Sequence, residues 1–191
     1  MDPMDKLSVL KKYFGHSSFR QGQEKLIDAI LSGEDALGIM PTGGGKSLCY
    51  QVPAMLLSGV TLVISPLISL MKDQVEGLTQ SGISAAYINS SLSAEEFRRI
   101  YQAARNGCYK LLYVAPERLD TEGFTALVQG LHISLVAVDE AHCISQWGQN
   151  FRPSYLRIPD FVASLPQRPV LAAFTATATA QVQSDIVNLL Q

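Results

Sequence analysis

The sequence GIMPTGGGKS, residues 38–47, decides the fold that we expect this chain to adopt. The apolar run 35–40 has the length of one buried strand, and residues 48–57 read as the start of a helix. Three glycines at the junction let the backbone turn tightly and bring N–H groups close to a ligand, and the helix start adds a partial positive charge. Lys46 adds a full charge and Ser47 a hydroxyl, which predicts a phosphate-binding loop for a nucleoside triphosphate and its magnesium.

A plainer interpretation of this stretch is also available. Glycine runs are more often surface loops, and Gly-Lys-Ser is a common tripeptide. Met40 also stands where the pattern G-x-x-x-x-G-K-[ST] has its first glycine. The predicted strand before the loop, the predicted helix after it and an acidic motif further along the chain favour the phosphate-binding interpretation.

Composition limits the classes of protein to consider. With 191 residues, 47% of them apolar and 17% charged, the chain suits one folded domain, 1–191. Its net charge of −2 argues against a wholly basic nucleic-acid binder, so any DNA contact must be local. Cys49, Cys108 and Cys143 form no C-x-x-C motif, which gives no zinc or redox signature and fits a cytoplasmic protein. No apolar run has the length of a membrane span, so we expect no membrane partner.

Apolar runs and helical segments alternate along the rest of the chain. Continuous apolar strands separated by helices indicate an α/β fold, with a mostly parallel, doubly wound sheet inside a three-layer αβα sandwich. Ligands bind such sheets at the carboxyl ends of the strands. Ser93 and Glu96 form the two halves of a capping box at one helix start. The expected strands are 60–65, 85–89, 110–115, 133–138 and 170–174. The expected helices are 67–80, 93–106, 121–129, 154–165, which Pro159 interrupts, and 179–191.

Residues 1–34 lead into the glycine loop and are predicted to be a helical segment. Gln23 carries an amide that can both donate to and accept from the edge of adenine. Arg20 carries a planar guanidinium that can stack on a base. The alternative is that both are ordinary surface residues at the start of a helix.

An acidic motif, Asp139-Glu140-Ala141-His142, directly follows an apolar run. A carboxylate at the end of a buried strand is costly unless a cation meets it, and magnesium is the natural candidate. We expect Asp139 and Ser47 to hold magnesium, and Glu140 to orient or deprotonate the attacking water. The alternative is that the two acids cap a helix, and the role of His142 stays open.

The segment 143–155 follows at once and contains Trp147, the only tryptophan of the chain. Aromatic residues mixed with glycine, polar groups and an arginine fit a loop that stacks on bases and contacts phosphate. We expect this function of Trp147 and Arg152. Packing of the loop onto the body of the domain remains the alternative for Phe151 and Tyr155.

Together these motifs resemble those of the RecQ-family DNA helicases of superfamily 2, and the likeness covers nearly the whole chain. The aromatic-rich loop makes the likeness specific to RecQ rather than to helicases in general. The segments that carry it are the adenine-reading motif at 14–23, the ATP loop at 40–51, two DNA-backbone motifs at 65–74 and 115–119, the DEAH box at 139–142, the aromatic-rich loop at 145–153 and the coupling motif at 175–178.

The resemblance implies a RecA-like P-loop NTPase domain that uses ATP and Mg²⁺. It implies the ATP-binding half of a 3′-to-5′ DNA helicase that acts in recombination and repair on single-stranded and partly duplex DNA. Lys46, Asp139 and Glu140 are then catalytic, while Ser47 and Asp139 hold the metal. The implied nucleotide contacts are His16, in place of a frequent stacking aromatic residue, and Arg20, Gln23, Thr42, Gly43, Gly44, Gly45, Lys46 and Ser47. The implied DNA-contact and coupling residues are Ser65, Lys72, Arg118, His142, Trp147, Phe151, Arg152, Thr175 and Thr177.

The family motor also has a second RecA-like domain whose arginines complete the ATP site, a zinc-binding region and a winged helix, and we expect none of these within this chain. The chain alone is therefore expected to bind Mg-ATP and to turn it over poorly. Two rival functions stay open. The first is a nucleotide-dependent DNA-binding module without turnover, which would have no need of Glu140. The second is a small-molecule kinase, which would leave the acidic motif and the aromatic-rich loop unexplained.

Overall fold

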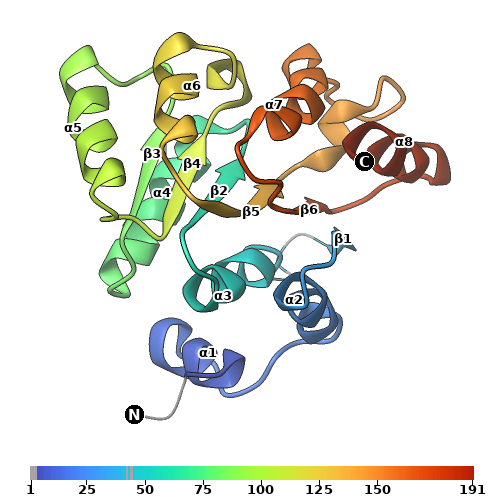
Figure 1. The fold of residues 1–191 in the computed structure, drawn as a ribbon. Coiled ribbons are helices and arrows are strands. Elements are labelled where there is room, and N and C mark those ends of the chain that lie inside the picture. The colour runs from blue at the N-terminus through green and yellow to red at the C-terminus, as the bar shows by residue number, and fades with distance from the viewer. Residues whose placement is uncertain (1–3, 42, 44) are drawn as a thin grey trace.

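A parallel six-stranded sheet forms the centre of the computed structural model (Figure 1), which describes residues 4–41, 43 and 45–191. The strand order is β1-β6-β5-β2-β4-β3, and every pair of neighbours runs parallel. This confirms the predicted doubly wound α/β fold. The strands are β1 (Ala36–Ile39), β2 (Val60–Ile64), β3 (Ala85–Ile88), β4 (Leu111–Val114), β5 (Ile133–Val138) and β6 (Val170–Thr175).

Helices cover both faces of the sheet and complete the predicted three-layer sandwich (Figure 1). One face packs against α3 (Leu48–Leu56) and α4 (Ile68–Gln80), with Tyr50 and Met71 among the buried residues. Because both faces are covered, all five residues of β2 are buried, which is why the strands read as continuous apolar runs. The opposite face packs against α5 (Ala94–Arg105), α6 (Glu122–Gln129), α7 (Ile158–Ser164) and α8 (Ala180–Leu190).

The two N-terminal helices pack against α3, and the second also contacts the edge of the sheet at β1 and β6. They are α1 (Lys6–Phe14) and α2 (Gln23–Leu31), as expected from the sequence. Leu10, Ile27 and Val52 bring α1, α2 and α3 together in a small apolar cluster. This packing places the start of α2 beside the glycine loop.

Local signals in the sequence fix several helix ends. The side chain of Ser93 accepts a hydrogen bond from the backbone N–H of Glu96, and the Glu96 carboxylate accepts one from the backbone N–H of Ser93, so the predicted capping box is confirmed. The helical segment expected over 154–165, with an interruption at Pro159, is divided in the structure. A 3₁₀ helix, η3 (Pro153–Arg157), precedes the short α7, since Pro159 lacks an N–H and is accommodated only in the first turn of a helix.

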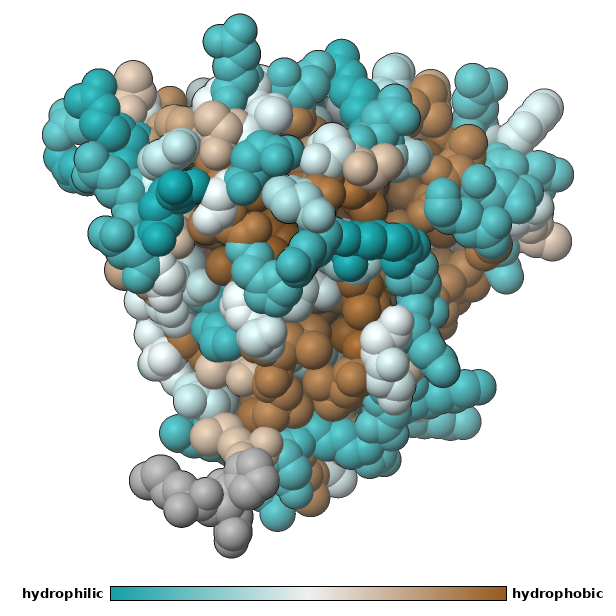
Figure 2. Space-filling view, viewed as in Figure 1, coloured by the Kyte–Doolittle hydropathy of each residue, from teal (hydrophilic) through white to brown (hydrophobic). Residues whose placement is uncertain are grey.

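Hydrophilic residues cover much of the face drawn in Figure 2, while apolar residues show through toward its centre. Among the described residues, no helix combines the length and the apolar character needed to cross a lipid bilayer.

Candidate functional site

The carboxyl ends of the neighbouring strands β1, β6 and β5 bring three loops together. The glycine loop follows β1, the segment 175–177 follows β6, and the acidic motif 139–142 follows β5. Because parallel strands end at the same edge of a sheet, motifs far apart in the sequence become neighbours here.

A cavity of about 650 Å³ opens at this edge. It unites the N-terminal segment, the glycine loop and the acidic motif. Phe14, the first residue of the predicted adenine-reading motif, also lines it, together with Tyr13. The described site residues that line the cavity are His16, Arg20, Gln23, Gly43, Gly45, Lys46, Ser47, Asp139 and Glu140, whereas Thr42 and Gly44 lie outside the described residues.

Arg20 and Gln23 contact the glycine loop itself. The Gln23 side chain accepts a hydrogen bond from the backbone N–H of Arg20 at 2.8 Å and donates to the Gly45 carbonyl oxygen at 3.1 Å. The Arg20 guanidinium donates to the Gly43 carbonyl oxygen. Gln23 is only 1% exposed, so the alternative that it is an ordinary surface residue is wrong, while Arg20 is exposed.

The backbone of the loop requires glycine at two described positions. Gly43 has a φ of +82° and Gly45 a φ of +78°, in the left-handed region that other residues rarely adopt. A Cβ atom on Gly45 would lie 2.3 Å from Gln23 Nε2. Gly43 and Gly45 therefore serve a specific backbone conformation, and Gly45 also a close approach to Gln23.

Ser47 and Asp139 fit a divalent cation by their chemistry. Ser47 begins α3 without a capping hydrogen bond from its side chain. Burial and the neighbouring charge of Glu140 raise the pKa of Asp139 to about 6, against the opposing effects of the Glu140 backbone N–H and of Lys46. A cation would stabilise this carboxylate. Within the described part of the chain, no group of three or more His, Cys, Asp or Glu side chains could hold a metal by itself, so water or phosphate oxygens would have to supply the other ligands.

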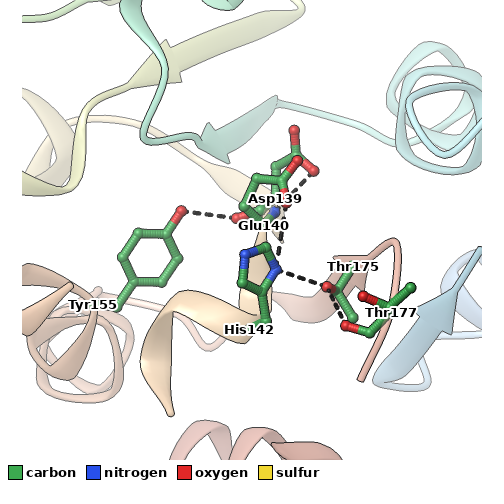
Figure 3. Close-up of polar contacts among 6 residues, drawn as sticks. All are labelled: Asp139, Glu140, His142, Tyr155, Thr175 and Thr177. Atoms are coloured by element: carbon green, nitrogen blue, oxygen red, sulfur yellow. Dashed lines mark hydrogen bonds and ion pairs between the residues drawn. The ribbon is translucent and has the colours of Figure 1, made fainter. Parts of the chain in front are cut away.

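Glu140 and Thr175 both lie close to Nδ1 of His142, beside Asp139 (Figure 3). His142 Nδ1 lies 3.3 Å from Glu140 Oε2 and 2.8 Å from Thr175 Oγ1. Thr175 Oγ1 also lies 3.2 Å from the carbonyl oxygen of Thr177, to which its hydroxyl can donate, and the tautomer of His142 sets the direction of its bond with Thr175. His142 therefore connects the end of β5 to the loop after β6.

Glu140 has left-handed backbone angles, with φ 49° and ψ 45°. Such a conformation is uncommon for a residue with a side chain and persists only where its surroundings enforce it. Here the Glu140 backbone N–H donates to Asp139 Oδ1 at 2.9 Å, and the Glu140 carbonyl oxygen accepts from Cys143 in the 3₁₀ helix η2 (Ala141–Ile144). The two acids thus begin a 3₁₀ turn, but their side chains line the cavity.

Tyr155, on η3, reaches the same motif from the other side. Its side chain is fully buried, so the packing alternative holds for this residue. Its hydroxyl also donates to the Asp139 carbonyl oxygen at 2.8 Å (Figure 3). Sequence reasoning missed this contact, because nothing in the pattern indicates which polar group a loop tyrosine will reach.

A second cavity, of about 730 Å³, lies against the aromatic-rich loop. Glu140 lines both cavities, which places the second next to the acidic motif. Trp147 is 76% exposed, whereas Phe151 and Arg152 are partly buried. The predicted DNA-contact and coupling residues that line this cavity are His142, Trp147, Arg152 and Thr177.

Three other predicted DNA-contact residues lie elsewhere. Ser65 is only 2% exposed, and its buried Oγ has no hydrogen-bond partner among the described residues. Lys72 lies 5.9 Å from the ring centre of Tyr87, and Arg118 lies 5.3 Å from that of Phe97. The structure does not bring these three side chains to either cavity.

Comparisons with known proteins agree with this geometry. Residues 20–186 match the family described as DEAD/DEAH box helicase. The chain is 51% identical to the ATP-dependent DNA helicase RecQ of Bacillus subtilis and 52% identical to that of Haemophilus influenzae, in each case over 96% of its own length. It spans only 31% and 30% of those relatives.

Solved structures support the fold. The helicase MrfA bound to DNA superimposes with a TM-score of 0.75 at 17% identity, over 98% of this chain and 29% of that one. A hypothetical ATP-dependent RNA helicase of Sulfolobus tokodaii gives a TM-score of 0.71 at 20% identity, over 97% and 54% of the two chains. The chain therefore belongs to the DEAD/DEAH box helicase family, and the relatives that it matches at about half identity are RecQ helicases.

Proposed function

We propose that this chain is the ATP-binding half of a 3′-to-5′ DNA helicase, which couples ATP hydrolysis to strand separation in recombination and repair in the cytoplasm. The observation that carries the proposal is the first cavity, where Lys46 and Ser47 face Asp139 and Glu140. Relatives named ATP-dependent DNA helicases support it. Residues 1–191 then form a first RecA-like domain that works against a second one of the same protein.

Each residue of the cavity takes one role in this proposal. Lys46 and the glycine-loop amides bind the phosphates. Ser47 and Asp139 hold Mg²⁺, which neutralises charge on the phosphate oxygens. Glu140 orients the attacking water and accepts its proton. His16, Arg20 and Gln23 lie where the base would bind. To contact adenine, Arg20 and Gln23 must give up their hydrogen bonds to the carbonyl oxygens of Gly43 and Gly45.

We propose that the chain alone turns ATP over slowly. Of the described cavity residues, only Arg20 and Lys46 are lysine or arginine, and Arg20 already donates to Gly43. Phosphoryl transfer in such sites commonly depends on a further arginine that stabilises charge in the transition state. The second RecA-like domain would supply that arginine.

DNA contact is proposed at the aromatic-rich loop. The exposed ring of Trp147 can stack on a base of single-stranded or partly duplex DNA. Arg152 donates its backbone N–H to the Cys143 carbonyl oxygen at 2.9 Å, one residue beyond His142. Movement of the loop can therefore reach His142, and through it Glu140 and Thr175.

The test is a titration of Mg-ATP binding, together with ATP turnover with and without single-stranded DNA. We expect binding with slow turnover, and Lys46→Ala should abolish the binding. Arg98→Ala, which removes a cation from the exposed side of α5, is the control and should bind normally. Normal binding by Lys46→Ala would overturn the assignment of the phosphate loop.

The same experiment separates the rival functions. Binding of DNA that depends on nucleotide, with no turnover even after a second RecA-like domain is supplied, would favour the binding module. Brisk turnover by the chain alone would contradict the need for an arginine from another domain.

A further inference from the structure

Ser145 joins the base of the aromatic-rich loop to the helix α8. Its side chain is completely buried. Ser145 Oγ lies 2.6 Å from Asp185 Oδ2 on α8, and 3.1 Å from the backbone nitrogen of Trp147. A residue 40 positions further along the chain thus contacts the group that fixes the tryptophan backbone.

The chemistry of the three groups sets the direction of both hydrogen bonds. A carboxylate has no hydrogen to give, so the Ser145 hydroxyl must donate to Asp185. Its lone pairs then point away from its hydrogen and accept from the N–H of Trp147. The bond to the charged group is short, as charge-assisted bonds are, and it orients the acceptor for the second bond.

Apolar packing holds Asp185 in place. Val182 and Ile186 of α8 belong to the same buried cluster as Cys143 and Ile144 of η2. On the exposed side, Gln181 donates to Asp185 Oδ1 at 2.9 Å. The two carboxylate oxygens therefore serve different donors, and the one that faces the loop is fixed by the contact of α8 with η2.

The turn at Ser145 leaves little room for another arrangement. The Gly148 backbone N–H donates to the Ser145 carbonyl oxygen at 3.1 Å, and a Cβ on Gly148 would lie 2.6 Å from the His142 carbonyl oxygen. The chain between these residues carries Trp147 outward, where most of its surface meets solvent. Loss of the Asp185 contact would free the hydroxyl to rotate and weaken the only side-chain bond recorded to the Trp147 N–H among the described residues.

We propose that Asp185 is a positioning residue for Trp147: through Ser145 it holds the aromatic-rich loop in the conformation that meets DNA. This inference rests on the proposed function in one respect only, the DNA contact of Trp147. Its structural part, the coupling of α8 to the loop, is independent of ATP and DNA.

The first experiment measures the coupling without ligand. Trp147 is the only tryptophan of the chain, so time-resolved fluorescence anisotropy reports on this loop alone. Ser145→Ala and Asp185→Ala should both lower the residual anisotropy, and the double variant should lower it no further than either alone. Gln181→Ala, which removes the other donor to Asp185, is the matched control and should match the unsubstituted chain.

The second experiment measures the consequence for DNA. Affinity for a single-stranded thymidine oligonucleotide should fall by about tenfold in Asp185→Ala, the change that corresponds to losing one hydrogen bond to a charged group. Mg-ATP affinity should not change. Asp185→Asn keeps the shape but leaves one acceptor oxygen for two donors, so it should give an intermediate anisotropy.

The outcomes separate the two proposals. Unchanged anisotropy in folded Ser145→Ala and Asp185→Ala, or in Asp185→Asn if Asp185→Ala does not fold, would overturn the inference whatever the DNA result. Lower anisotropy with unchanged DNA affinity would equally overturn the role of Asp185 in DNA contact. If the unsubstituted chain does not bind the oligonucleotide, the proposed function fails, and the anisotropy comparison still decides whether Asp185 positions the loop.

Discussion

The phenol oxygen of Tyr155 lies 2.8 Å from the carbonyl oxygen of Asp139, which ties the end of the aromatic-rich segment to the first acid of the site. The Tyr155 side chain is fully buried, so the bond gives its hydroxyl a partner away from water. The bond also fixes Asp139, the residue directly before Glu140 with its left-handed backbone conformation.

Tyr155→Phe should therefore lower the free energy of unfolding by about 0.5–1.5 kcal/mol, the usual net contribution of one intramolecular hydrogen bond. Urea unfolding of the chain measures this. Tyr101→Phe, which removes a phenol oxygen from α5, is the control and should change the free energy by less than about 0.5 kcal/mol. Equal effects of the two substitutions would show that the Asp139 contact adds no stability.

Gly45→Ala should abolish nucleotide binding and destabilise the fold. The new Cβ would lie 2.3 Å from Gln23 Nε2, and the alanine would also have to adopt the φ of +78° that Gly45 has. Gly82→Ala is the matched control, because Gly82 has a φ of +84° with no other atom within 4 Å of its Cβ position. Both variants should lose about 1–2 kcal/mol from backbone strain, but only Gly45→Ala should lose Mg-ATP affinity in a titration. Loss of affinity in Gly82→Ala would point to a general effect on folding.

Asp139 should make the metal-free chain less stable as the pH rises. Its pKa is raised from 3.8 to about 6 in the fold, so between these values the folded state binds the extra proton and stability falls with increasing pH. Asp139→Asn should remove this dependence and be more stable at pH 7 by roughly 2–3 kcal/mol, since one pKa unit corresponds to about 1.4 kcal/mol.

Urea unfolding from pH 4 to pH 8 in the presence of a chelator tests this dependence. The difference between Asp139→Asn and the unsubstituted chain should shrink toward zero near pH 4. A difference that stays constant with pH would show that the Asp139 pKa is not raised. Added Mg²⁺ with nucleotide should stabilise only the unsubstituted chain.

Trp147→Ala should leave the free energy of unfolding within about 0.5 kcal/mol, because 76% of the residue is exposed and little packing is lost. Mg-ATP affinity should be unchanged. Stimulation of ATP turnover by single-stranded DNA should be lost in the full helicase, since base stacking on an aromatic ring contributes about 1–3 kcal/mol per base. Leu156→Ala, which truncates another exposed apolar side chain (42% exposed), is the control and should keep the stimulation. Stimulation that is retained in Trp147→Ala would contradict a role of Trp147 in DNA contact.

Much of the fold could be predicted from short-range patterns. The six apolar runs became the six strands to within two residues, because a strand buried on both faces must be apolar throughout. The capping box of Ser93 was equally local. The helix expected over 154–165 is divided next to Pro159, as the interruption expected there indicated, but the periodicity of the apolar residues did not reveal that its first part is a 3₁₀ helix.

The sequence by itself determined the fold class, the places of the glycine loop and the acidic motif along the chain, and the family, because each depends on residue type and spacing along one stretch of chain. Tertiary structure decided which of these residues meet. Four hydrogen bonds depend on it: Gln23 bonds to the Gly45 carbonyl oxygen, His142 to Thr175, Tyr155 to Asp139 and Ser145 to Asp185. These contacts join residues between 16 and 40 positions apart, and hydrogen bonds of about 3 Å form only after the strand order and the packing of helices have fixed where each side chain lies.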